Sequence, residues 1–253
     1  MISVIVLGTG NVGTHLIKTF LNTQNVVLAQ VFSRKKSSLI PFKNKVATTI
    51  SIRDLKEADV YIIAISDDAI PEFSSQLHYK NKLIVHTSGS ASINALKNKG
   101  DKGVFYPLQT FSKKYDVDFS SIPICIETEK ENNIQLLKKL AKSISNNVYL
   151  IDSEQRKRLH VAAVYSNNFV NHLCKISHDI CKEHLIPFEI LHPLIIETAQ
   201  KITSNNPMDI QTGPAHRNDT KTINTHLELL SGEQKKIYQL LTESIQKTYG
   251  EKL

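Results

Sequence analysis

The fold of this chain is decided by its first stretch, Ile2-Ser3-Val4-Ile5-Val6-Leu7 followed at once by Gly8-Thr9-Gly10-Asn11-Val12-Gly13. The apolar run predicts a buried strand, and the amphipathic residues 15–21 predict a helix after the glycines. A G-x-G-x-x-G turn between a strand and a helix lets backbone amides approach a dinucleotide pyrophosphate at the helix N-terminus. We therefore predict that residues 8–13 bind a dinucleotide; the alternative is a glycine-rich turn without a ligand.

The choice of dinucleotide is read at the end of the second predicted strand, residues 26–32. An NAD-binding protein places an acidic residue about twenty residues after the glycines, whereas this chain has Ser33-Arg34-Lys35. The guanidinium of Arg34 is a planar set of donors that suits a 2′-phosphate. The sequence therefore predicts NADP(H) as the cofactor. The alternative is that residues 34–36 are only a solvated loop of charge.

Composition limits the remaining possibilities. A chain of 253 residues with 41% hydrophobic content can bury a full core, and its length favours two domains. No basic leader precedes the first strand and no apolar run is long enough to span a membrane, so we expect a cytoplasmic protein without a membrane partner. The three cysteines, at 125, 174 and 181, fit free thiols in a reducing compartment. The net charge of +7 comes from scattered lysines, which argues against a nucleic-acid partner.

Strand and helix patterns alternate as far as Asp152, which indicates an α/β, doubly wound Rossmann-like sheet over residues 1–152. Further strands are predicted at 46–49, 60–65, 83–85, 104–106, 122–126 and 148–151, with a helix at about 131–144.

After Asp152 the strand-like runs stop, which predicts an all-helical domain over residues 153–253. Ser153 is the expected N-cap of a helix that continues to about Glu183. Pro187 ends the connection that follows. Later helices are expected at about 189–203, 220–230 and 232–249.

Ligands of open α/β sheets lie beyond the carboxyl ends of the strands, and two such segments carry polar groups. Ser66 and Asp67 follow the fourth strand and are placed to line the nicotinamide ribose; a helix N-cap is the alternative. His86 ends the fifth strand, followed by Ser88 and Gly89, which would let the nicotinamide approach backbone. The alternative for His86 is a hydrogen-bonded structural histidine.

Three further segments are candidates for the substrate site. After the sixth strand, Gln109 lies in Tyr106–Ser112, which forms either an active-site wall or a loop anchored by its aromatic residues. At about 100° per residue, His160, Asn167 and Asn171 share one helical stripe, with Asn168 beside it. Such a stripe faces a wet cleft or satisfies loop backbone. Arg217, in the loop before a helix, would hold an anionic or carbonyl ligand; the alternative is that it pairs with Asp219 or with a neighbouring subunit.

Four segments together resemble one known family. They are His86-Thr87-Ser88-Gly89-Ser90, Pro107-Leu108-Gln109-Thr110-Phe111-Ser112, the helix with Ala162-Ala163 and Asn168-Phe169-Val170-Asn171, and Thr212-Gly213-Pro214-Ala215-His216-Arg217-Asn218-Asp219. They resemble an uncharacterised bacterial family in which a Rossmann-like NADP-binding domain precedes a helical domain of unknown function. The resemblance covers essentially the whole chain and implies an NADP oxidoreductase without an assigned reaction.

The arrangement is more distantly similar to 6-phosphogluconate and β-hydroxyacid dehydrogenases, pyrroline-5-carboxylate reductase, prephenate dehydrogenase and deazaflavin-dependent NADP reductases. This similarity implies a helical domain of the 6-phosphogluconate-dehydrogenase type and a homodimer through the helices. Two departures concern catalysis. No lysine stands one helical turn before the asparagines of the long helix, and Tyr106-Pro107-Leu108 replaces the histidine-containing segment of prephenate dehydrogenases.

The sequence therefore favours hydride transfer between NADP(H) and a small carbonyl or imine, or in reverse an alcohol or amine, in a cleft between the domains. Asn168 or Asn171 would bind the acceptor oxygen, and His160 or His86 would donate the proton. One alternative is a non-catalytic NADP-binding sensor or scaffold, and another is a prephenate-like dehydrogenase. Metal-binding and nucleophile-elbow motifs are lacking, so no metal is expected and hydrolase chemistry is disfavoured.

Overall fold

The computed structural model of the chain describes residues 1–249. Its internal contacts divide the chain into two compact units, Met1–Val164 and Tyr165–Leu253, of which residues 250–253 lie outside the described part. The helical domain was predicted over residues 153–253, so its last four residues lie outside the described part as well. The predicted boundary between residues 152 and 153 coincides with the start of a helix and stays a prediction.

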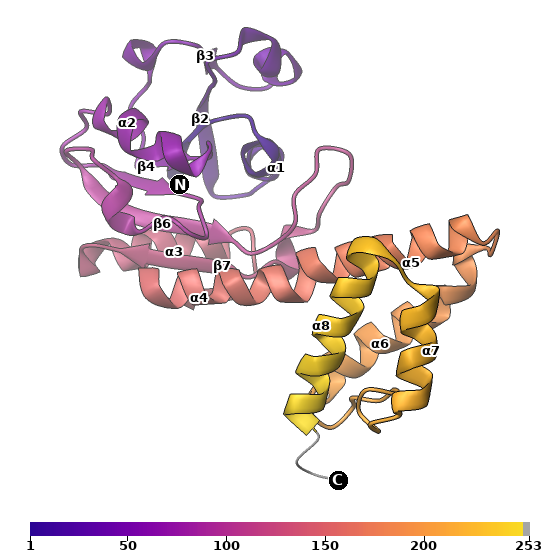
Figure 1. The fold of residues 1–253 in the computed structure, drawn as a ribbon. Coiled ribbons are helices and arrows are strands. Elements are labelled where there is room, and N and C mark those ends of the chain that lie inside the picture. The colour runs from indigo at the N-terminus through magenta and orange to yellow at the C-terminus, as the bar shows by residue number, and fades with distance from the viewer. Residues whose placement is uncertain (250–253) are drawn as a thin grey trace. The chain divides into compact units, whose positions relative to one another are not determined.

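The first unit is built on one eight-stranded sheet with the order β3-β2-β1-β4-β5-β6-β7-β8 (Figure 1). Its first six strands follow the order typical of dinucleotide-binding folds. The strands are β1 Ile2–Leu7, β2 Val26–Phe32, β3 Thr48–Thr49, β4 Val60–Ile63, β5 Leu83–His86, β6 Asp101–Pro107, β7 Ile124–Thr128 and β8 Val148–Leu150.

Both faces are buried at the central strands β1, β4 and β5 of this sheet. In β1, Val4 and Val6 point into one core cluster with residues of the helices α1 (Asn11–Leu21) and α3 (Ile134–Lys142). Ile5 and Leu7 point into the other cluster, with residues of the short helix α2 (Ile70–Ser75). Side chains of a strand alternate between faces, so a strand with consecutive apolar residues, such as Val4–Leu7, must be covered on both sides. The predicted doubly wound sheet is confirmed.

The connections decide the direction of the last strands. Residues 108–123 join β6 to β7 with only one 3₁₀ turn, Phe119–Ser121, and these two strands are antiparallel. The helix α3 joins β7 to β8, which are parallel. A parallel pair needs a crossover, which is usually a helix, whereas an antiparallel pair does not. The short strand predicted at 46–49 comprises only Thr48–Thr49, because just two residues pair with β2.

The second unit is helical. It contains α5 (Val170–Glu183), α6 (His192–Ser204), α7 (Thr220–Leu229) and α8 (Gly232–Tyr249), with a 3₁₀ turn at Phe188–Leu191. The bounds of the last two helices agree with the sequence prediction to within one residue. Within residues 1–249, no helix is both long and apolar enough to cross a membrane.

The long helix differs from its prediction in two respects. Helix α4 (Ser153–Ala163) is capped by Asp152 and not by Ser153, because the Asp152 carboxylate accepts from the Gln155 amide at 2.8 Å while the Gln155 side chain accepts from the Asp152 amide, a capping box. Residues Val164–Phe169 form a π-helical segment before α5 begins. A π turn changes the rotation per residue, so the prediction of uninterrupted α-helix is wrong over these six residues.

Candidate functional site

A cavity of about 1670 Å³ lies at the carboxyl ends of β1, β2, β4 and β5. Nine of the predicted cofactor residues line it: Gly8, Thr9, Gly10, Asn11, Val12, Ser33, Arg34, Lys35 and Ser66. Gly13, Asp67, Ser88 and Gly89 are not among its lining residues. The cavity therefore joins the glycine turn and the Ser33-Arg34-Lys35 segment in one space, although these segments lie far apart in the sequence.

The three glycines of the turn are required for different reasons. Gly8 has φ +123°, and a Cβ there would lie 2.2 Å from the Ala64 carbonyl oxygen. A Cβ on Gly13 would lie 2.2 Å from the Gly8 carbonyl oxygen, which would prevent α1 from packing. A Cβ on Gly10 would meet only the Ala64 oxygen, at 3.9 Å. The fold itself therefore needs Gly8 and Gly13, whereas Gly10 keeps the cavity wall bare at the start of α1, where phosphate groups bind.

A cluster of hydroxyl groups lies where β1 and β2 end. The Thr9 Oγ1 hydroxyl donates to Ser33 Oγ at 3.0 Å or to Ser38 Oγ at 2.8 Å, and these two serine oxygens are 2.8 Å apart. The cluster holds the segment that carries Arg34 and Lys35 against the glycine turn. NAD-binding proteins carry a carboxylate after the second strand, and it would repel a 2′-phosphate. In this chain the same place holds neutral hydroxyl groups and the cations Arg34 and Lys35.

The cavity is electropositive. Among the residues that line it, four side chains are basic and Glu72 alone is acidic; the basic ones are Arg34, Lys35, Arg53 and Lys113. A cleft lined by one sign of charge concentrates ligands of the opposite sign. Its cations and its bare helix N-terminus fit a dinucleotide that carries an extra phosphate.

The loops after β4 and β5 are joined by Asp67. Its Oδ2 atom accepts hydrogen bonds from the Ser88 hydroxyl at 2.7 Å and the Ser90 hydroxyl at 2.5 Å. The structure thus brings together the predicted residues Ser66, Asp67 and Ser88 at one edge of the sheet. Ser66 stands at the N-cap position of a 3₁₀ turn but its side chain makes no capping hydrogen bond.

His86 is fully buried at the end of β5. Its Nδ1 accepts from the Ser88 amide at 3.2 Å, so the neutral ring carries its proton on Nε2 and donates to the Ser92 carbonyl at 3.3 Å. Burial and the nearby Arg156 charge lower the pKa of His86 to about 4. A neutral imidazole with both nitrogens bonded to its own loop matches the structural alternative for this residue.

Gly89 has a role in packing. A Cβ at this position would lie 2.6 Å from His160 Nδ1 and 2.8 Å from Tyr106 Cζ. The Tyr106 hydroxyl and His160 Nδ1 are themselves 3.0 Å apart. Burial raises the pKa of Tyr106 to about 12, so the phenol keeps its proton at neutral pH. The turn after β5 therefore leaves room for a Tyr106–His160 pair, which comes from β6 and α4.

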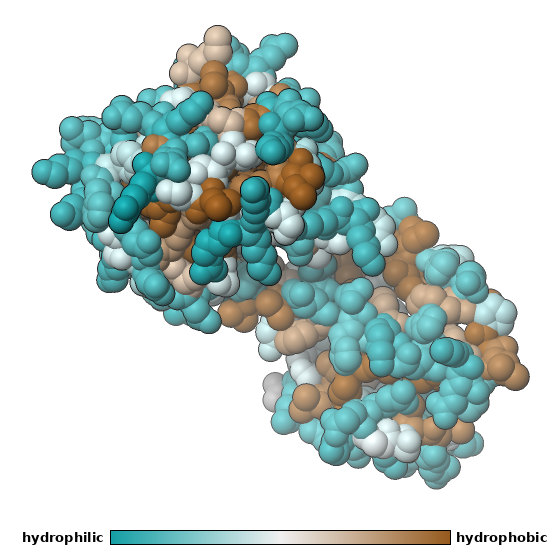
Figure 2. All heavy atoms as spheres, turned by 90° about the horizontal axis from the view of Figure 1, so that it is seen from above, coloured by the Kyte–Doolittle hydropathy of each residue, from teal (hydrophilic) through white to brown (hydrophobic). Residues whose placement is uncertain are grey.

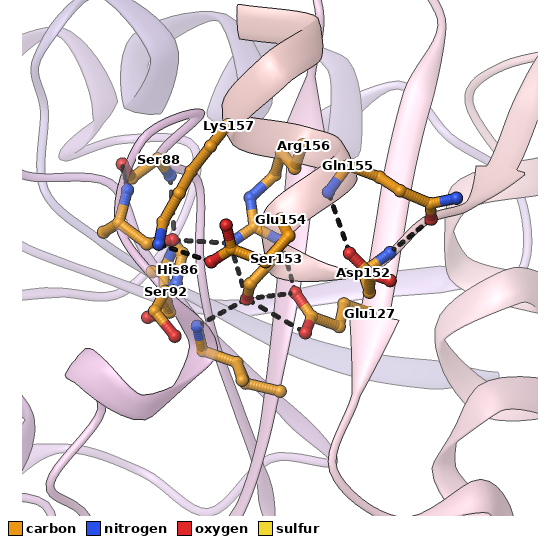
Figure 3. A network of polar contacts seen from close by, with 12 residues as sticks. His86, Ser88, Ser92, Glu127, Asp152, Ser153, Glu154, Gln155, Arg156 and Lys157 are labelled. Carbon is orange, nitrogen blue, oxygen red and sulfur yellow. Dashed lines mark hydrogen bonds and ion pairs between the residues drawn. The ribbon is translucent and has the colours of Figure 1, made fainter.

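Arg156 anchors α4 to this turn (Figure 3). Its side chain is 1% exposed and pairs through Nη1 with the Glu127 carboxylate of β7, while Nη2 donates to the Ala91 carbonyl. The Ser153 hydroxyl donates to Glu127 at 2.8 Å and accepts from the Ile93 amide at 3.0 Å. The residues before and after Ser92 are thereby held from two sides.

The remaining predicted residues are at the surface. Gln109 is exposed, and its side-chain oxygen accepts from the Thr110 amide at 2.8 Å. Asn167 and Asn168 lie in the π-helical segment and Asn171 in α5, all exposed. Their common stripe with His160 was derived from the 100° rotation per residue of an α-helix, which does not hold through the π-helical segment. The roles of these asparagines stay predictions.

Arg217 is also exposed, in the loop before α7. Asp219, its suggested acidic partner, caps α7 by accepting from the Thr222 amide at 3.0 Å and the Thr222 hydroxyl at 2.7 Å. These bonds lower the pKa of Asp219. The ion pairs found within residues 1–249 do not include one between Arg217 and Asp219.

Sequence reasoning missed several residues of this region. Glu127 could have been noticed, because a carboxylate in the otherwise apolar run Ile124-Cys125-Ile126 needs a partner. Its partner Arg156 gave no signal, since it stands in the charged run Arg156-Lys157-Arg158. Arg53 lines the cavity from the 3₁₀ turn Ile52–Asp54, and Lys113 from the residue after the Pro107–Ser112 segment, two positions that no motif singled out. Among the described residues, no group of three or more His, Cys, Asp or Glu side chains could hold a metal ion.

Two family models match the chain. Residues 3–89 match the model described as NADP oxidoreductase, coenzyme F420-dependent. Residues 122–245 match a domain of unknown function, DUF2520. A search of curated proteins found no match.

Solved structures match over nearly the whole length. A protein from Bacteroides fragilis, described as a "putative NADP oxidoreductase", is 36% identical with a TM-score of 0.88, covering 97% of this chain and 98% of that chain. A Streptococcus pyogenes 1-pyrroline-5-carboxylate reductase is 15% identical with a TM-score of 0.66, covering 99% and 97%. An imine reductase from Myxococcus stipitatus, in complex with NADP⁺, is 15% identical with a TM-score of 0.63, covering 98% and 93%. The last two likenesses concern the fold alone.

Proposed function

We propose that this chain, which belongs to the family of NADP oxidoreductases represented by the Bacteroides fragilis protein, transfers hydride between NADP(H) and a small molecule with a carbonyl or imine group, or the corresponding alcohol or amine. One observation carries the proposal: a single cavity is lined by the glycine turn, by Ser33-Arg34-Lys35 and by Ser66. The first segment suits a pyrophosphate, the second a 2′-phosphate, and the third follows β4, where the ribose of the nicotinamide is expected.

The cofactor supplies the hydride chemistry, and the protein supplies binding and orientation. Gly10 and the start of α1 would hold the pyrophosphate, and Arg34 would hold the 2′-phosphate. The Asp67–Ser88 hydrogen bond would fix the two loops that face the nicotinamide half. The imine and pyrroline-5-carboxylate reductases of the same fold act on C=N bonds, which is why an imine stands beside a carbonyl in the proposed substrate class.

His160 is the proposed proton donor. In the imidazolium form, Nδ1–H donates to the Tyr106 hydroxyl oxygen 3.0 Å away, which orients the ring, and Nε2–H is the proton that would be given to the substrate, leaving a neutral imidazole. His86 is less suited, because its ring is fully buried and neutral. Asn168, Asn171 and Arg217 remain proposed substrate ligands, from the sequence alone.

The proposal is tested by binding and by turnover. Replacing Arg34 with Ala should weaken NADPH binding roughly tenfold to hundredfold, because it removes charge-assisted hydrogen bonds to the 2′-phosphate, and it should leave NADH binding nearly unchanged. Lys36→Ala is the matched control, since Lys36 is exposed and is not among the cavity-lining residues. Equal losses for both dinucleotides would refute the cofactor assignment. NADPH oxidation across carbonyl, imine and 2-keto-acid panels then tests the reaction.

The second unit supports a homodimer, which we propose through its helices. Among its described residues, only Cys181, Ala215, Ile223 and Thr242 are buried. Large apolar side chains are exposed on α6 and α8, and hydrophobic residues lie among hydrophilic ones on the surface (Figure 2). A unit with so few buried residues has little core to stabilise it, and exposed apolar surface of this kind favours association. Sedimentation equilibrium should give a dimer.

A further inference from the structure

The loop between β6 and β7 is held against the dinucleotide-binding helix α1. His15 of α1 is 3% exposed, and its Nε2 donates to the Ser112 carbonyl at 2.9 Å. Its ring also packs against Phe111, with the ring centroids 5.4 Å apart. Lys18 of α1 pairs with Asp116 at 2.8 Å. Figure 1 shows this loop beside α1.

These contacts come from one face of α1, because His15 and Lys18 are three residues apart. His15 lies one turn after the start of the helix at Asn11. The loop is therefore fixed close to the helix N-terminus, next to the glycine turn.

Lys113 follows the anchored Ser112 directly and lines the cavity together with Gly10 and Asn11. Its side chain is exposed, and no ion pair within the described part of the chain involves it. Lys114, its neighbour, does not line the cavity. The loop, which is fixed to α1 at Ser112, thus places one of two consecutive lysines at the cavity.

We infer that Lys113 binds the pyrophosphate of the dinucleotide, and that His15 positions it by holding the loop. The inference rests on the proposed function. Lys113 is distinct from Arg34 in what it recognises: Arg34 follows β2 at the hydroxyl cluster, where a 2′-phosphate is expected, whereas Lys113 is carried on a loop fixed to α1. The ammonium adds a point charge to the amides of the helix N-terminus, which is a common way to bind phosphate.

Isothermal titration calorimetry with NADPH and with NADH tests the inference on the full chain. Lys113→Met should raise the Kd of both dinucleotides by the same factor, about tenfold at low ionic strength, because both contain the pyrophosphate. The factor should shrink as salt is added. Lys114→Met removes a charge at the neighbouring position, which does not line the cavity. It should therefore change either Kd by less than about twofold. Lys113→Arg should restore most of the affinity.

The role of His15 is tested by a double-mutant cycle. His15→Leu should weaken binding in the wild-type background and add little to Lys113→Met, because both changes remove the same contact. Circular dichroism checks that the His15→Leu variant folds. The test of Lys113 does not depend on this variant.

The outcomes separate the two proposals. If the wild-type chain binds NADPH but Lys113→Met matches Lys114→Met, the pyrophosphate role is wrong and the proposed function stands. If Lys113→Met affects NADPH alone, Lys113 belongs to the 2′-phosphate site and the inference is overturned. A wild-type chain that binds neither dinucleotide overturns both proposals.

Discussion

Replacing Arg156 with Met should destabilise the first unit strongly. The Arg156 side chain is 1% exposed and that of Glu127 is 14% exposed, so the change leaves a largely buried carboxylate without its counter-ion. The Ala91 carbonyl also loses its donor. Removing one partner of a buried pair costs about 3–5 kcal/mol. For a domain of this size, that corresponds to a fall of roughly 6–20 °C in Tm.

Urea unfolding followed by circular dichroism measures this loss. Arg158→Met is the matched control, because Arg158 lies on the same helix but is exposed, and it should cost less than about 0.5 kcal/mol. Adding Glu127→Gln to Arg156→Met removes the uncompensated charge and should recover part of the stability. The reasoning fails if Arg156→Met costs no more than Arg158→Met, or if the second substitution lowers the stability further.

Two other predictions concern the turn after β5. The pKa of His86 falls from 6.5 to about 4 on folding, so between these pH values the unfolded chain binds more protons than the folded chain. The free energy of unfolding should therefore decrease as the pH falls from about 6.5 to 4. An NMR titration of His86 with a midpoint near 6.5 would contradict this. Gly89→Ala places a Cβ 2.6 Å from His160 Nδ1 and should cost about 1–3 kcal/mol in thermal unfolding. The cost should be smaller in a His160→Ala background, where only the 2.8 Å approach to Tyr106 Cζ remains, and an equal cost in both backgrounds would refute the packing against His160.

The fold could be predicted from the sequence because its signals are local. The run Ile2–Leu7 predicted a strand covered on both faces, and its residues do divide between two core clusters. The π-helical segment at Val164–Phe169 could not be predicted, because its residues carry no breaker such as proline or glycine. The N-cap was displaced by one residue, since Asp152 and Ser153 are both good caps and only Asp152 meets Gln155 in a capping box.

The candidate site was predictable where one short segment does the recognition. Residues 8–13 and 33–35 each have a chemistry that can be read from adjacent positions, and the structure brings them to one cavity. Lys113 could not be found in this way, because its place depends on contacts between its loop and α1. Arg156 was equally hidden, since a charged run on a helix is usually solvated.

Gly89 shows why the cofactor could be inferred more readily than the reaction. Its sequence context suggested a bare backbone for the nicotinamide, but the space where its Cβ would lie is taken by Tyr106 and His160, which are 54 residues apart in the sequence. Dinucleotide binding depends mainly on backbone and helix termini, which a glycine pattern reveals. Proton transfer depends on side chains that converge only in the folded chain. If His160 donates the proton, Tyr106→Phe should keep NADPH affinity and lower turnover, because the ring loses the bond that orients it.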